Sequence, residues 1–108
     1  MMAAPRTRKA RSFEQDLLWS VLDQDAVPHI LAMAHDSWGL DSAAAWTALR
    51  EQATLGRLRA YRNEGSPAPV DLAQAPLDEA GQDYKLFVEP TEATFARLRE
   101  IGAESASS

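Results

Sequence analysis

The residues of this chain best suited to chemistry are basic and hydroxyl side chains gathered in two segments. Residues 1–12 carry four basic groups and no acid, for a charge of +4. Residues 41–62 carry four arginines against two acids, for a charge of +2. Because such side chains donate hydrogen bonds to phosphates and base edges, they are candidates for binding duplex DNA. The candidates are Ser42, Thr47, Arg50, Arg57, Arg59 and Arg62, together with Arg6, Arg8, Lys9 and Arg11.

Acidic residues fill the segments that flank these candidates. Residues 13–40 and residues 63–83 each carry five acids and no base, and the whole chain has a formal net charge of −5. Negative charge repels phosphate and attracts basic surfaces. A second function therefore stays open, in which the chain binds a protein partner through the acidic segment 63–83 or an exposed apolar surface.

Other kinds of chemistry lack the residues that they need. The chain has no cysteine, and His29 and His35 are six positions apart, which places them on different faces of a helix. No glycine-rich phosphate loop or nucleophile elbow is present, so we expect no metal, no cofactor and no enzymatic activity. Since no apolar run approaches about 18 residues, and none follows the basic start, we expect a cytoplasmic protein without membrane contact.

Two helices are predicted upstream of the second basic segment. Ser12 and Gln15 have the spacing of a capping box and begin a helix over residues 12–23. Another helix begins near Asp25 or Val27, since the proline that follows is tolerated in a first turn. Apolar side chains recur at helical spacing in both helices. They are Phe13, Leu17, Leu18, Val21 and Leu22, then Ile30, Leu31, Met33 and Ala34.

A third helix carries three of the candidate DNA-binding residues, Ser42, Thr47 and Arg50. Asp41 can cap it, alanines fill its first turn, and Gly56 suits the left-handed position that follows a helix over residues 41–55. Trp46 and Leu49 are expected to be buried against the first two helices. The remaining tryptophans, Trp19 and Trp38, are also expected in the core.

Two strands and a last helix complete the predicted elements. Residues 57–62 and 84–89 alternate apolar and polar side chains and should pair as an antiparallel hairpin. The proline-containing segment 63–83 is expected to be a long acidic loop with one helical turn near Asp71 or Leu77. A final helix is capped by Thr91 and ends at Gly102.

This order of elements resembles a winged helix-turn-helix domain over roughly residues 12–101. Leu40 matches the apolar turn residue of small bacterial regulators, Leu49 a core leucine of the recognition helix, and Gly56 the glycine before the wing. KLFVEPTEATFARL is similar to the second wing strand and the helix after it. Gln52 stands where these regulators have a core leucine.

The resemblance implies an α+β fold with a three-helix core, a two-stranded wing hairpin with a long acidic loop, and a C-terminal helix. Residues 1–11 would be a disordered basic arm, residues 12–102 the domain, and residues 103–108 a flexible tail. The function implied is that of a small, dimeric transcriptional regulator that binds DNA with helix 41–55 and strand 57–62. The alternative is a winged-helix protein-interaction module that binds no nucleic acid.

Overall fold

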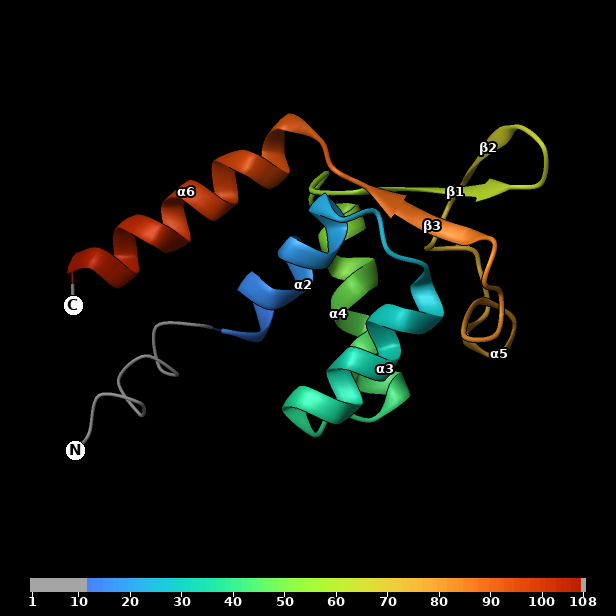
Figure 1. The fold of residues 1–108 in the computed structure, drawn as a ribbon, viewed down its shortest axis with the longest axis horizontal. Helices are drawn as coiled ribbons and strands as arrows, with labels where there is room; N and C mark the ends of the chain where they lie inside the picture. The colour runs from blue at the N-terminus through green and yellow to red at the C-terminus, as the bar shows by residue number, and fades with distance from the viewer. Residues whose placement is uncertain (1–11, 108) are drawn as a thin grey trace.

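Three helices form the first half of the fold in the computed structural model, which describes residues 12–107 and the side chains up to residue 103. They are α2 (Phe13–Leu22), α3 (Val27–Trp38) and α4 (Ser42–Thr54), labelled as in Figure 1. The expected basic arm, residues 1–11, lies outside the described residues, and so do Arg6, Arg8, Lys9 and Arg11.

The helix boundaries follow the predicted capping residues. The Ser12 hydroxyl accepts a hydrogen bond from the backbone N–H of Gln15 at 3.1 Å. The Asp41 carboxylate accepts one from the N–H of Ala44 at 2.8 Å. Each bond satisfies an N–H group that has no partner within its helix, so the predicted starts of α2 and α4 are confirmed. Gly56 has φ +75°, the left-handed conformation expected after α4.

The second half of the fold is a small antiparallel sheet followed by a helix. The sheet contains β1 (Arg59–Asn63), β2 (Pro67–Val70) and β3 (Leu86–Glu89) in the order β2-β1-β3. The predicted pairing of the first and last of these strands is confirmed. The segment between α2 and α3 continues the sheet past β3, because Ala26 bridges Phe87.

The segment 63–83 contains the helical turn expected near Leu77, but it also contains a strand that its prolines did not predict. It contains the edge strand β2 and a single helical turn, α5 (Leu77–Ala80). Pro67 and Pro69 have no N–H to donate, and an edge strand tolerates this because one of its sides has no neighbouring strand. The expected two-stranded hairpin is therefore part of a three-stranded sheet.

The core lies between the helices and the inner face of the sheet. Trp46 and Leu49 are buried, as predicted, and the sheet adds Leu58, Ala60, Leu86 and Val88. The prediction for Trp19 is wrong, because this side chain is 53% exposed. Trp38 is half-buried, and its indole N–H donates to the Asp16 carboxylate at 2.8 Å.

The last helix, α6 (Glu92–Ser107), lies over α2 and extends past the N-terminal end of α2 (Figure 1). The expected end at Gly102 is wrong. Gly102 is not among the glycines with positive φ, so it continues the helix at the modest cost of a mid-helix glycine. The predicted tail therefore belongs to α6 up to Ser107.

Candidate functional site

The three α4 side chains assigned to DNA are exposed, as a recognition surface requires, but the segment 71–83 borders them. The Arg50 guanidinium donates to the carbonyl oxygen of Ala73 at 3.0 Å. The Thr47 hydroxyl donates to the carbonyl oxygen of Ala43 within its own helix, also at 3.0 Å. Ser42 lines a groove formed with α3 and α5. Two of the three side chains thus already donate a hydrogen bond inside the domain.

Arg57 faces the interior of the fold and does not belong to an exposed DNA-binding face. Its guanidinium lies 3.0 Å from a Glu14 carboxylate oxygen, and its side chain is only 22% exposed. It also donates to the side-chain oxygen of Gln52 at 3.3 Å. Because the guanidinium already has a carboxylate partner, binding of a phosphate by Arg57 would require this ion pair to break.

Glu14 joins three elements that are far apart in the sequence. Its two carboxylate oxygens accept hydrogen bonds from Arg97 of α6 at 2.8 and 2.9 Å, in addition to the bond from Arg57. The hydrogen bond from Arg97, together with the charges of both arginines, lowers the pKa of Glu14 despite its partial burial. We call Glu14, Gln52, Arg57 and Arg97 the Glu14 cluster.

The position of Gln52 in this cluster explains the departure from the leucine of similar domains. Gln52 is 6% exposed, and its side-chain oxygen accepts the bond from Arg57. A leucine there would leave the arginine with one partner fewer in a poorly hydrated place. No sequence signal indicates the cluster, because Arg57 and Arg97 are 43 and 83 residues from Glu14.

The two arginines of β1 also face carboxylates of their own chain. Arg62 donates to the carboxylate of Asp83 at 2.7 Å. Burial alone would raise the pKa of Asp83, but hydrogen bonding and the charge of Arg62 outweigh it, so the pKa is lowered. Arg59 lies 3.5 Å from Glu89 on the neighbouring strand, and its side chain is 69% exposed. Arg62 is thus held firmly beside an acid, whereas Arg59 makes a looser surface pair.

An acidic groove lies between α3 and α5, beside the first turn of α4. The groove has a volume of about 870 Å³, and its lining includes the apolar side chains of Leu31 and Leu77 and the carboxylates of Asp36 and Asp78. Gly81, directly after α5, also lines the groove, and a Cβ at this position would lie 3.0 Å from the carbonyl oxygen of Leu77. The remaining lining residues are Pro28, Ala32, His35, Ser42 and Gln82. We call this site the α3–α5 groove.

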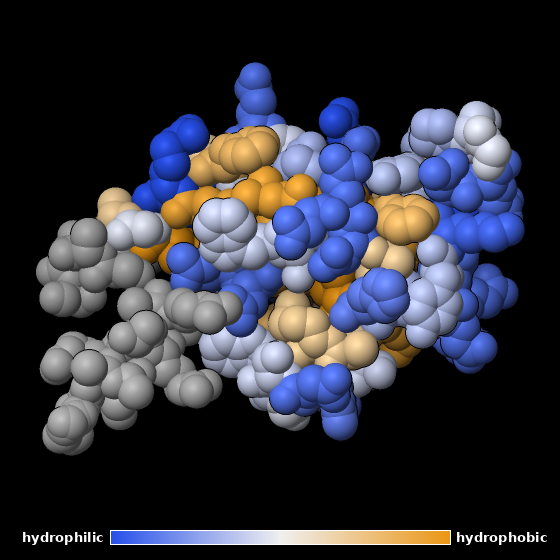
Figure 2. All heavy atoms as spheres, in the orientation of Figure 1, coloured by the Kyte–Doolittle hydropathy of each residue, from blue (hydrophilic) through white to orange (hydrophobic). Residues whose placement is uncertain are grey.

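Several large apolar side chains are exposed away from this groove. Trp19 of α2 and Phe95 of α6 are 53% and 46% exposed, and Tyr84 before β3 is 61% exposed. Apolar side chains on the visible face gather where α6 lies over α2, and hydrophilic ones surround them (Figure 2). This second surface is a candidate for contact with protein.

Metal and membrane sites are not found in the part of the chain that the structure describes. Residues 12–107 contain no group of three His, Cys, Asp or Glu side chains that could hold a metal ion. None of the helices in this range combines the length and the apolar composition needed to cross a membrane. No family model, no curated protein and no solved structure matches the chain.

Proposed function

We propose that this chain is a winged-helix protein-interaction module and that its α3–α5 groove receives a cationic segment of the partner. The winged-helix assignment is supported by the order α2, α3, α4, β1, β3 and by the bridge of Ala26 to β3. The choice of groove is supported by its apolar lining and its two carboxylates, which suit a segment of alternating aliphatic and basic residues.

The observation that carries this proposal is the internal pairing of the three arginines in residues 57–62. Arg57, Arg59 and Arg62 each lie within 3.5 Å of a carboxylate oxygen of the same chain. A phosphate would have to displace that carboxylate before it gained the same charge-assisted bond. Binding to DNA would therefore release few counterions for each contact that it makes.

The charge of the folded domain also opposes DNA. Residues 12–107 contain seven basic residues and all sixteen acids of the chain. Asp78, in α5, lines the same groove as Ser42 at the start of α4, where a recognition helix would approach the DNA backbone. Negative charge at this place repels phosphate and attracts a cationic partner.

The second candidate function is the DNA-binding transcriptional regulator expected from the sequence. The exposure of Arg59 favours it, since this side chain makes only a loose pair and stands free of the Glu14 cluster. Ser42, Thr47 and Arg50 are also exposed along one helix. In this alternative the exposed arginine would reach phosphate while α4 enters the major groove.

Fluorescence anisotropy on the full chain tests the proposal with two probes. The first is a labelled peptide of alternating leucine and lysine, and the second is a pool of random-sequence 30-base-pair duplexes. We expect the peptide to bind saturably. We expect the duplexes to bind with a Kd no lower than about 10⁻⁴ M at physiological salt, which is the weak limit of non-specific association. A duplex bound at sub-micromolar Kd, or a peptide that does not saturate, contradicts the proposal.

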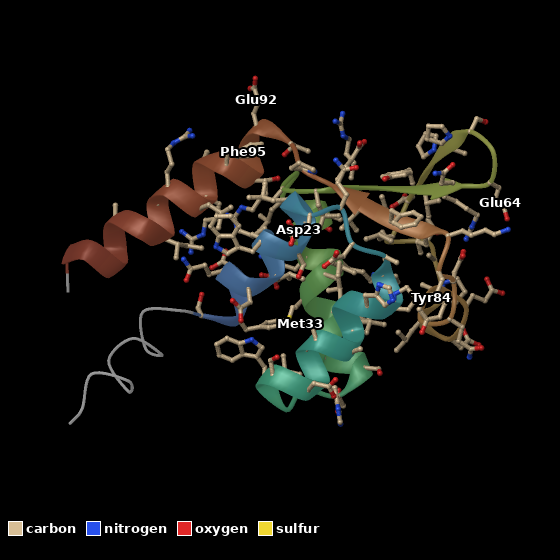
Figure 3. The ribbon with its side chains drawn as sticks, viewed as in Figure 1. Asp23, Met33, Glu64, Tyr84, Glu92 and Phe95 are labelled. Atoms are coloured by element: carbon tan, nitrogen blue, oxygen red, sulfur yellow. The ribbon has the colours of Figure 1, made fainter. Side chains whose placement is uncertain are left out.

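A matched pair of variants locates the peptide site. The double change Asp36→Lys and Asp78→Lys reverses the charge of the groove and should weaken peptide binding at least about tenfold. The control changes Asp23→Lys and Glu64→Lys alter the net charge equally at exposed sites outside the groove (Figure 3). Equal weakening by both doubles would show that only net charge attracts the peptide.

A further inference from the structure

The side of α6 that faces away from the rest of the protein carries an acid near one end and a base near the other. The inner side is used within the fold: Thr94 and Ile101 are buried, and Arg97 binds Glu14. The outer side has a shallow hollow lined by residues two turns apart. These lining residues are Glu92, Ala93, Phe95, Ala96 and Arg99.

Opposite charges stand at the two ends of this hollow. Glu92 and Arg99 are both exposed, and neither has an ion-pair partner among the residues that the structure describes. Figure 3 shows Glu92 pointing away from the protein near the start of α6. Phe95, between the two charges, is 46% exposed, and Ala96 beside it leaves room for a bulky neighbour. An acid, an aromatic ring, a small residue and a base thus follow one another along the helix.

This pattern is complementary to a second copy of itself in antiparallel orientation. Glu92 and Arg99 are separated by about 10.5 Å along the helix axis, and their midpoint lies between Phe95 and Ala96. A two-fold axis through that midpoint places each acid against the base of the partner subunit and each ring against the partner's alanine. A parallel arrangement would instead place like charges together.

We propose that the chain forms a homodimer in which α6 pairs with α6 of the partner subunit about this two-fold axis. The interface is isologous, because the same patch serves both subunits. It contains one helix face from each copy and is small, so we expect a concentration-dependent dimer with a Kd in the micromolar range. This inference is independent of the partner bound at the α3–α5 groove.

Sedimentation equilibrium of the full chain and a charge swap test the pairing. We expect a monomer–dimer equilibrium for the wild type. In Arg99→Glu two acids face each other, so the Kd of the dimer should rise at least about tenfold. The double variant Glu92→Arg and Arg99→Glu restores opposite pairs and should regain the wild-type Kd within a factor of about three. The control Lys85→Glu reverses one exposed charge elsewhere and should leave the Kd unchanged.

Three results would overturn the proposal. The first is a wild type that stays monomeric up to a few hundred micromolar, and the second is an Arg99→Glu variant that dimerises as the wild type does. The third is a double variant that stays as weak as the single one. Circular dichroism checks that each variant is folded, which we expect because Glu92 and Arg99 are exposed.

Single cysteines report the orientation of the helices, because the chain has none of its own. Ala96→Cys lies beside the two-fold axis, within the Cα separation that a disulfide allows, and should cross-link two copies under mild oxidation. Glu92→Cys lies about 10.5 Å along the axis from its own counterpart in the antiparallel dimer and should not. Cross-linking of Glu92→Cys at an equal or greater rate would contradict the antiparallel arrangement.

Discussion

Replacing Glu14 by glutamine removes the charge that holds α2, the segment between α4 and β1, and α6 together. The substitution keeps the size and one acceptor oxygen of the side chain, so it isolates the contribution of the charge. Arg57 and Arg97 would lose their shared carboxylate partner. We therefore expect Glu14→Gln to lower the free energy of unfolding without changing the fold.

The burial of the cluster sets the magnitude of this effect. Removing one partner costs about 3–5 kcal/mol in a buried ion pair and about 0–1 kcal/mol in an exposed one. The three charged side chains are 22–27% exposed, so their environment lies between these limits. We expect a loss of about 2 kcal/mol, which lowers the Tm of a domain of this size by about 8–16 °C.

The sign of the pH dependence follows from the lowered pKa of Glu14. Bonding to Arg97, with the charges of both arginines, holds that pKa below its ordinary value of 4.5 in the folded state. The stabilisation is therefore fully present above the unfolded pKa and is lost as pH falls through the folded pKa. The difference in unfolding free energy between the wild type and Glu14→Gln should be constant near neutral pH and shrink below pH 4.5.

Urea unfolding at pH 7 and pH 3.5 measures both effects. Glu100→Gln is the matched control, because Glu100 also contacts Arg97 but is 62% exposed, and its loss should cost less than about 0.5 kcal/mol. A Glu14→Gln variant as stable as this control at pH 7 would show that the Glu14 cluster adds nothing to stability.

Three further substitutions test the fold by urea unfolding. Leu49→Ala should cost about 2–5 kcal/mol because the side chain is completely buried, and a loss below about 0.5 kcal/mol would remove α4 from the core. Asp41→Ala removes the cap of α4 and should cost about 1 kcal/mol, whereas Asp41→Asn should cost much less. Gly56→Ala should cost about 1–2 kcal/mol through backbone strain alone, since φ is +75° and no atom would lie within 4 Å of the added Cβ; an unchanged stability would refute the left-handed conformation.

The elements that the sequence predicts well are those specified by neighbouring residues. Asp41 and Gly56 mark the ends of α4 through local hydrogen bonding and backbone conformation, and the alternation of Leu58 and Ala60 with polar residues indicates β1. The strand β2 was missed because Pro67 and Pro69 disfavour a strand in general, although an edge position accepts them.

The candidate site was less predictable because its decisive contacts are distant in the sequence. Arg57 follows α4 in a pattern that suits phosphate binding, and nothing near it indicates that Glu14 is its partner. The pairing of Arg62 with Asp83 likewise depends on how the segment 63–83 folds back beside β1. Composition correctly indicated that this segment is acidic, but not that α5 would form a groove with α3.

Amide chemical-shift mapping of the ¹⁵N-labelled full chain shows directly which surface binds which partner. Titration with the leucine–lysine peptide should shift the amides of the α3–α5 groove, centred on Leu31, Leu77 and Gly81. Titration with random-sequence duplex should leave residues 42–50 and Arg59 unshifted at physiological salt. Duplex-induced shifts concentrated on Ser42, Arg50 and Arg59, with none in the groove on adding peptide, would contradict the assignment of this domain to protein binding.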